Sequence, residues 1–374
     1  MARYVWQTKS WPDFRWDSKV LLGPLGMVRQ AQGQILGLAE FFGLELQAEV
    51  LSQEALTTAA IEGERLDREA VRSSVARRLG LPTAGLPSPG KDVEGLVEML
   101  LDATRNYQEP LTAKRLKGWQ KGLFPTGYSG MNRIVTGDWR RGDKPMRVVS
   151  GPIGKETVHY EAPPAHVVGK MVREFLDWFR LPRDDIDGLL RAALAHFWFV
   201  TIHPFEDGNG RIARAIADMA LAQDERSERR LYSMSAQIDR DRDGYYEALE
   251  EGQKGNGDVT RWMAWFFGCL ERAIKRSESE VHKAADKARM WQELAHLSLN
   301  ERQRKVINKL FEAEPAGFEG GLTNSKYVGM TKTSRETAKR DIADMVAKGI
   351  LIRNPAGGRS VSYSLSWKSH KPAS

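Results

Sequence analysis

The sequence predicts a mainly α-helical protein in which β-structure is confined to two short hairpins. Apolar residues recur at spacings of three and four over most of the chain, for example between residues 92 and 107. Alternation typical of strands is limited to residues 147–160 and 351–365. The hydrophobic content of 41% and the mean hydropathy of -0.48 are those of a soluble globular protein, and 374 residues suffice for two or three domains.

Composition narrows the setting in which the protein acts. No apolar run is long enough to span a bilayer and the N-terminus lacks the apolar core of a signal peptide, so we expect no membrane association. The single cysteine, Cys269, excludes an intrachain disulfide and favours a cytoplasmic location. A net charge of +7 hints at an acidic partner, although the charges are mixed along most of the chain.

The N-terminal region divides into an aromatic arm and two helical stretches. Trp6, Trp11 and Trp16 recur every five residues, a spacing that fits neither a helix face nor strand alternation. We therefore expect an extended arm whose aromatic side chains pack on the body of the protein. Helical spacing follows over residues 18–42 and 49–65.

The middle of the chain alternates helices with one hairpin. Residues 81–90 carry three prolines and two glycines, which predict a turn-rich connection. Two short valine-containing stretches around Gly-Pro-Ile-Gly predict a β-hairpin over residues 147–160. The remaining helices of this region are expected at 92–107, 112–124, 167–181, 184–202, 212–222, 233–251 and 262–274.

Residues 203–214 carry most of the chemistry that the sequence offers. The stretch His-Pro-Phe-Glu-Asp-Gly-Asn-Gly-Arg-Ile-Ala-Arg lies between two apolar helical runs, so it forms a loop that opens a helix. Unpaired N–H groups and the helix dipole favour an anion there, and glycine lets the backbone approach a phosphate. Arg211 and Arg214, one turn apart, would bind further phosphate oxygens. Asp207 offers a hard oxygen ligand for Mg²⁺, and His203 is a candidate general base.

This stretch resembles the Fic-domain signature, His-x-Phe-x-(Asp/Glu)-Gly-Asn-Gly-Arg-x-x-Arg, and matches it at every specified position. Proteins with this signature are mostly AMP transferases, which move AMP from ATP to a Ser, Thr or Tyr hydroxyl of a target protein. The resemblance implies that His203 deprotonates the hydroxyl and that Asp207 holds Mg²⁺. It implies that the nucleotide is bound by Phe205, Gly208, Asn209, Gly210, Arg211, Arg214, Tyr245 and Tyr246. Core packing is the alternative for the adjacent tyrosines, because they point to different faces of a helix.

Two further segments resemble parts of the same family. Thr58, Glu62 and Gly63 fit the inhibitory motif (Ser/Thr)-x-x-x-Glu-(Gly/Asn). On a helix Thr58 and Glu62 share a face and Gly63 suits a C-terminal cap, so the Glu62 carboxylate would pair with Arg214 and block the γ-phosphate. The alternative is a surface glutamate at a helix end. The segment Trp-Pro-x-Phe-x-Trp-Asp, residues 11–17, resembles the start of one Fic subfamily.

The predicted hairpin has a counterpart in the Fic fold. There a hairpin serves as the flap, whose edge strand aligns the target protein by main-chain pairing. The resemblance therefore assigns Val158, His159 and Tyr160 to target docking. A second catalytic base is the alternative role for His159.

The C-terminal part differs in composition from the rest. Residues 275–299 predict a charged helical connector. Helical stretches at 301–313, 325–328 and 333–348 then precede two short strands, which resembles a winged helix-turn-helix domain. The cations expected to contact duplex DNA are Lys332, Arg335, Lys339, Arg340 and Arg359. The alternative is a winged helix that serves protein contact or dimerisation.

Together these patterns predict an N-terminal arm and inhibitory region at 1–90, a Fic catalytic domain at 91–274, a connector at 275–299 and a winged-helix domain at 300–374. The leading hypothesis is ATP- and Mg²⁺-dependent adenylylation of a protein hydroxyl, on a target or on the chain itself, restrained by Glu62. Removal of AMP at the same site is one alternative. A DNA-binding regulator that uses the Fic domain as a nucleotide sensor is another. The target protein, the DNA sequence and the oligomeric state, including a homodimer, stay open.

Overall fold

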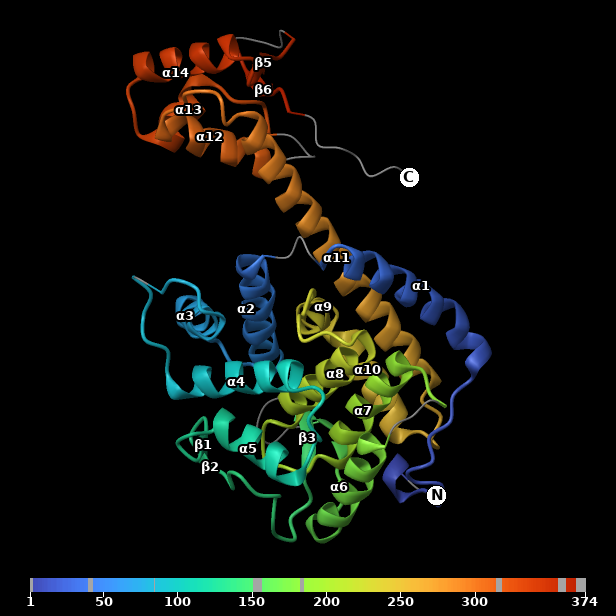
Figure 1. The fold of residues 1–374 in the computed structure, drawn as a ribbon. Coiled ribbons are helices and arrows are strands. Elements are labelled where there is room, and N and C mark those ends of the chain that lie inside the picture. The colour runs from blue at the N-terminus through green and yellow to red at the C-terminus, as the bar shows by residue number, and fades with distance from the viewer. Residues whose placement is uncertain are drawn as a thin grey trace. The chain divides into compact units, whose positions relative to one another are not determined.

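A computed structural model describes residues 3–39, 43–83, 85–150, 157–181, 185–313, 318–355 and 361–367. The chain divides into two compact units, Met1–Glu278 (unit 1) and Ser279–Ser374 (unit 2), and the helix α11 (Thr260–Glu293) crosses the boundary. Both units consist mainly of helices, which confirms the predicted mainly α-helical class (Figure 1). In the described part of the chain, no helix has the length and apolar character needed to cross a bilayer.

The helices of unit 1 follow the periodicity of the sequence. Their bounds are α1 (Ser18–Gly37), α2 (Leu44–Ile61), α3 (Arg68–Leu79), α4 (Lys91–Arg105), α5 (Ala113–Leu123), α6 (Ala165–Arg180), α7 (Gly188–Ile202), α8 (Asn209–Glu225), α9 (Met234–Arg240) and α10 (Arg242–Lys254). The single helix predicted at 233–251 is two helices, because the chain leaves helical geometry at Asp241. The helix α3 was not predicted, since its buried side chains are mostly small and give no apolar stripe.

Helices α7 and α8 lie at the centre of unit 1 and carry the signature loop between them (Figure 1). Every side chain of α7 from Ala192 to Ile202 is buried. The N-terminal arm packs on this helix, with the rings of Trp11 and Phe14 edge-on to Trp198. The arm also contains a turn of 3-10 helix at Val5–Gln7, so it is less extended than predicted. The arm thus covers part of α7, and most side chains of α8 are buried as well.

The strands form three two-stranded antiparallel sheets among the described residues. Their bounds are β1 (Tyr128–Ser129) with β2 (Asn132–Arg133), β3 (Arg147–Ser150) with β4 (Thr157–Glu161), and β5 (Leu351–Arg353) with β6 (Tyr363–Leu365). The prediction that β-structure is confined to two hairpins is wrong, because β1–β2 is a third. Two residues per strand are too few for alternation to mark it. The turn predicted within 151–154 lies outside the described residues.

Unit 2 contains α12 (Glu301–Glu312), α13 (Asn324–Thr331) and α14 (Arg335–Ala347), followed by the β5–β6 hairpin. Asn300 caps α12 as expected, accepting a hydrogen bond from Gln303 N at 3.0 Å. The carboxylate of Asp341 on α14 accepts hydrogen bonds from Tyr327 Oη (2.8 Å) and Arg302 Nε (2.9 Å). One acid thus joins α12, α13 and α14.

Candidate functional site

The signature loop is held in one conformation by its own side chains. His203 ends α7 in the left-handed region (φ 51, ψ 59), and Gly208 precedes α8 with φ 89. Asn209 folds back between them: its side-chain oxygen accepts from Phe205 N and its amide nitrogen donates to Phe205 O, both at 2.9 Å. Asn209 and Phe205 are buried, so their side chains support the loop and leave its backbone to meet a ligand.

The imidazole of His203 is oriented to accept a proton. Its Nδ1 lies 3.2 Å from Val200 O and donates to that carbonyl, which leaves Nε2 as the acceptor. Burial lowers the pKa of His203 to about 4, assisted by the charge of Arg140 and opposed by the hydrogen bond to Val200 and the charges of Glu62 and Asp207. The ring is therefore neutral at pH 7.

The two arginines of the signature are buried and already bonded. Arg214 donates to Thr58 Oγ1 (2.7 Å), to Thr58 O (2.9 Å) and to Glu62 Oε1 (2.8 Å). Arg211 donates to Glu64 Oε2 at 2.7 Å. The expected contact between Glu62 and Arg214 is present, through one carboxylate oxygen. Arg211 Nε and Arg214 Nη1 make no hydrogen bond with any described residue, so each arginine keeps a donor for a further acceptor.

Glu62 and Glu64 reach these arginines because of the way α2 ends. The helix closes with a Schellman motif, in which Glu64 N donates to the carbonyl five residues earlier (3.0 Å) and Gly63 N to the carbonyl three residues earlier (2.9 Å). Gly63 has φ 81, a conformation that side chains with a Cβ rarely adopt. A Cβ on Gly210 would lie only 2.2 Å from Glu62 Oε1. The Glu62 carboxylate therefore covers the first turn of α8, where an anion would bind.

Asp207 is the carboxylate of the loop that a metal ion would use. Its Oδ1 accepts from Gly208 N (2.5 Å) and from Arg211 Nη2 (3.4 Å), and its Oδ2 accepts from the Ser129 hydroxyl. The described residues hold no group of three or more His, Cys, Asp or Glu side chains suited to a metal. A single carboxylate fits Mg²⁺, which keeps several waters and binds largely through substrate phosphates.

A pocket of about 730 Å³ lies beside the signature loop, and Asp207, Arg211 and Arg214 are not part of its lining. This volume is typical of a site for a small molecule. Its walls include Glu62, Gly63, His203 and Gly210. The flap strands β3 and β4 and the helix α10 supply most of the remaining lining, including Val148, Val149, His159, Arg242, Tyr245 and Tyr246.

The two tyrosines contribute to this pocket in different ways. Tyr245 is buried, and its Oη lies 3.0 Å from Nε2 of the buried His196. Tyr246 is 42% exposed and donates to Ile61 O, at the end of α2, at 3.3 Å. Both line the pocket, while Tyr245 also belongs to the core.

The flap residues also divide by environment. Val158 pairs with Val149 across β3–β4. His159 lines the pocket and its Nδ1 lies 2.8 Å from Glu250 Oε2 on α10. Tyr160 is buried and donates to Thr201 O at 2.6 Å, near the end of α7. The Tyr160 side chain therefore anchors the strand.

Several contacts of the loop come from residues that no sequence pattern marked. Arg140 Nε donates to His203 O at 2.8 Å. Glu206, a variable position of the signature, accepts from Val135 N at 2.9 Å. Ser129 donates to Asp207, and Glu64 accepts from Arg211. Only Glu64 could have been suspected, because it directly follows the inhibitory motif.

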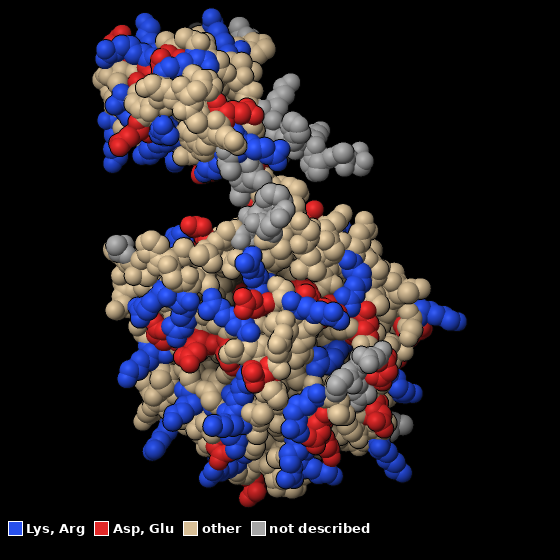
Figure 2. Space-filling view, in the orientation of Figure 1, with Lys and Arg blue, Asp and Glu red and all other residues tan. Residues whose placement is uncertain are grey.

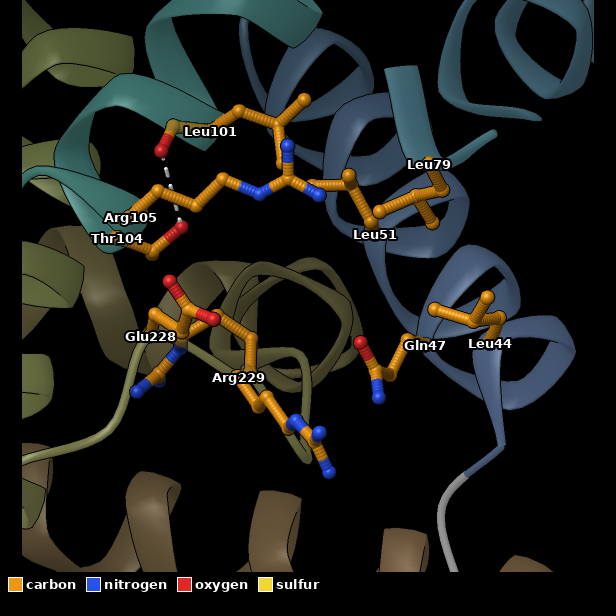
Figure 3. Close-up of a pocket in the computed structure, with 10 residues that line it drawn as sticks. Leu44, Gln47, Leu51, Leu79, Leu101, Thr104, Arg105, Glu228 and Arg229 are labelled. Carbon is orange, nitrogen blue, oxygen red and sulfur yellow. Dashed lines mark hydrogen bonds between the residues drawn. The ribbon is translucent and has the colours of Figure 1, made fainter. Parts of the chain in front are cut away.

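A second pocket in unit 1, of about 150 Å³, has a different character (Figure 3). Leu44 and Gln47 of α2 form one side and Thr104 and Arg105 of α4 form another. Its lining includes no residue of the signature loop. It therefore lacks the candidate base and the helix start that line the larger pocket.

The cations expected to contact DNA lie in unit 2. Lys332, Arg335, Lys339 and Arg340 are exposed, and none of them forms an ion pair with a described residue. Figure 2 shows Lys and Arg side chains gathered on the visible face of this unit. Arg359 lies outside the described residues.

Comparison with known proteins identifies two segments of the chain. Residues 4–81 match the family model described as "Domain of unknown function (DUF4172)", and residues 110–221 match the model described as "Fic/DOC family". The chain therefore contains a Fic domain, and this domain includes the whole signature loop.

Curated relatives match over part of the chain. A probable protein adenylyltransferase of Aquifex aeolicus is 32% identical over 96 residues, which are 26% of this chain and 27% of that protein. The protein adenylyltransferase Fic of Nematostella vectensis is 35% identical over 107 residues, 28% of this chain and 23% of the relative. The chain thus spans under a third of the length of these relatives.

One solved structure resembles most of the chain. The crystal structure of a Fic family protein from Desulfovibrio desulfuricans G20 has a TM-score of 0.54 and 19% identity. The match covers 94% of this chain and 97% of that one. At this identity the likeness shows a shared fold.

Proposed function

We propose that this chain, whose residues 110–221 form a Fic domain, transfers AMP from ATP to a Ser, Thr or Tyr hydroxyl of a protein target or of the chain itself. The observation that carries the proposal is one pocket that joins a neutral imidazole to the start of α8. Beside that helix start, two buried arginines each keep a donor for phosphate oxygen. Both curated relatives bear the name of this activity.

The geometry supports a direct transfer. The target hydroxyl oxygen would form a bond to the α-phosphorus while the bond from that phosphorus to the bridging oxygen breaks, and pyrophosphate would leave. The hydroxyl proton would pass to His203 Nε2, which its Nδ1 contact leaves free to accept. Arg211, Arg214 and the N–H groups of α8 would stabilise the charge that accumulates on the leaving phosphates.

The adenosine part of ATP would occupy the part of the pocket beside α10. Tyr245 and Tyr246 line it there, and Tyr246 offers an exposed ring for stacking. Asp207 would hold Mg²⁺, which neutralises phosphate charge when bound. The β3–β4 flap would align the backbone of the target, with His159 near its path.

Glu62 would keep this activity low in the resting protein. Its carboxylate occupies Arg214 and covers the first turn of α8, the two features that would bind the outer phosphates. Competition of this kind requires no partner protein, because the inhibitor is part of the same chain.

Labelling with α-³²P-ATP and Mg²⁺ tests the proposal. The Glu62→Gly variant should incorporate AMP into itself or into proteins of a lysate, and more strongly than the unaltered chain. Adding His203→Ala should reduce incorporation by about 10²- to 10⁴-fold, the usual contribution of a general base. Nucleotide binding should persist in that double variant. If no protein is labelled by any variant, in lysate or alone, the transfer proposal is wrong.

Removal of AMP is the second activity that this pocket supports. Glu62 and His203 line the same pocket, so the carboxylate that blocks ATP would also be placed to orient a water at phosphorus. Release of AMP from a pre-labelled protein measures this reaction. Glu62→Gly should raise transfer and lower removal, and unchanged removal would exclude the second role.

A regulator that contacts DNA through unit 2 is a candidate of another class. The exposed cations around α14, which lack ion-pair partners among the described residues, favour it. In such a protein the Fic domain would serve as a nucleotide sensor and would have no need of His203. Loss of labelling in the His203→Ala variant therefore separates an enzyme from a sensor.

A further inference from the structure

Arg140 bonds to the catalytic turn and to the end of the flap at the same time. It lies in the irregular segment between β2 and β3 and is 5% exposed. Its Nε donates to His203 O at 2.8 Å, and its backbone N donates to Pro204 O at 2.9 Å. Its Nη2 donates to Pro163 O, two residues beyond the end of β4.

The guanidinium of Arg140 has no counter-ion among the described residues. Its side chain donates only to backbone carbonyls, and no described carboxylate pairs with it. Burial accordingly lowers the pKa of Arg140. By contrast Arg211, Arg214 and Arg230 each pair with a carboxylate. Burying an unpaired charge costs free energy, and here the charge lies beside the candidate base.

Arg140 bonds to the turn at His203 and to the end of the flap, and the transfer requires these two segments to hold a fixed position relative to each other. His203 is one of the non-glycine residues with positive φ, and Arg140 donates to the carbonyl of that strained residue. Tyr160 Oη, on the flap strand, donates to Thr201 O two residues before it. Arg140 and Tyr160 therefore tie the flap to the turn that presents the imidazole.

We propose that Arg140 is a positioning residue for the transfer, which holds the His203 imidazole at a fixed place relative to the flap that aligns the target hydroxyl. The inference rests on the proposed function. Arg140 would act through His203 and the flap and not on ATP itself, because its Nε and Nη2 already donate to the carbonyls of His203 and Pro163. Its loss should therefore slow the chemical step and leave nucleotide binding intact.

The test compares transfer with binding in the Glu62→Gly background. Arg140→Met should lower the initial rate of AMP incorporation from α-³²P-ATP by about 10- to 100-fold, since a misplacement near 1 Å costs about that much. The Kd for ATP with Mg²⁺, measured by calorimetry, should stay within about two-fold of the background value. Arg140→Lys keeps the charge and one donor, so its rate of AMP incorporation should lie between the rate of the Glu62→Gly background and that of Arg140→Met.

Arg115→Met is the matched control. Arg115, on α5, also donates to backbone carbonyls, those of Asp102, Asn106 and Glu109. Unlike Arg140 it also pairs with a carboxylate, that of Asp102, and it does not line the pocket. Its loss should affect stability without a selective loss of rate.

Three outcomes would overturn the inference, and a fourth would refute the proposed function. A rate for Arg140→Met within two-fold of the background overturns the inference, as does a weakening of ATP binding in proportion to the rate. If Arg140→Met does not fold, an unchanged rate in Arg140→Lys overturns it. A background that transfers no AMP at all would instead refute the proposed function, so the two failures are distinguishable.

Discussion

The arginines of the signature loop and the cations of α14 are both candidates for binding phosphate, and their surroundings are opposite. Arg211 and Arg214 are 3% exposed, and each meets a carboxylate from the end of α2. Arg335 and Lys339 are exposed and have no carboxylate partner among the described residues. Buried cations that are paired with carboxylates suit a site that binds phosphate only after those carboxylates have moved away. Exposed ones suit long-range attraction, which salt screens.

Glu62→Gly is the largest expected perturbation of the buried pair. Removing the carboxylate frees Arg214 and uncovers the first turn of α8. A hydrogen bond to a charged group contributes about 1.5–3 kcal/mol, so the affinity for ATP should rise about 10- to 100-fold. Calorimetric titration with ATP and Mg²⁺ measures this change. Equal affinities would show that the contact does not compete with the nucleotide.

A double substitution in α14 tests the exposed cations. If the full chain binds mixed-sequence duplex DNA, Arg335→Ala with Lys339→Ala should lower the salt slope of log K by about two and weaken binding about ten-fold near 0.1 M salt. Lys305→Ala with Lys309→Ala removes the same charge from exposed positions of α12 and serves as the control. Lack of binding even at low salt, or equal losses in the two double variants, would argue against α14 as the contact surface.

Glu64→Gln tests whether the second carboxylate shares the block. Its side chain is 41% exposed, so its pair with Arg211 is screened more than a buried pair. We expect ATP affinity to rise about two- to five-fold, and the effect to add to that of Glu62→Gly. Glu49→Gln, on α2 and paired only with exposed arginines, is the control. If Glu64→Gln and Glu49→Gln bind ATP with equal affinity, Glu64 does not compete with the nucleotide and Glu62 is the principal inhibitory residue.

Sequence patterns could predict the residues that belong to a recognisable motif. They could not predict residues that reach the site only through the folding of distant segments. The helix period and the signature located α7, the loop and α8, and the inhibitory motif predicted the contact of Glu62 with Arg214. The hydrogen bonds of Arg214 to Thr58 were not predicted. Arg140 lies in an irregular segment and donates to carbonyls, and no spacing rule marks such a residue. The β1–β2 hairpin, which brings Ser129 to Asp207, has strands too short to show alternation.

The smallest expected effect concerns pH, and it follows from the burial that distinguishes the loop from α14. His203 acts as a base when deprotonated, and burial lowers its pKa to about 4, with Arg140 assisting and Glu62 and Asp207 opposing. Transfer should therefore rise as the pH increases through about 4 and change less than two-fold, on account of this group, between pH 6 and 8. An exposed histidine, with a pKa near 6.5, would instead give a rise of about three- to four-fold across that interval. The Glu62→Gly substitution removes a negative charge that raises the pKa of His203. The pH at which the transfer rate falls on the acid side should therefore not increase in this variant. A half-maximal rate near pH 6.5 in that variant would show that the imidazole is solvated during transfer and that burial does not set its protonation.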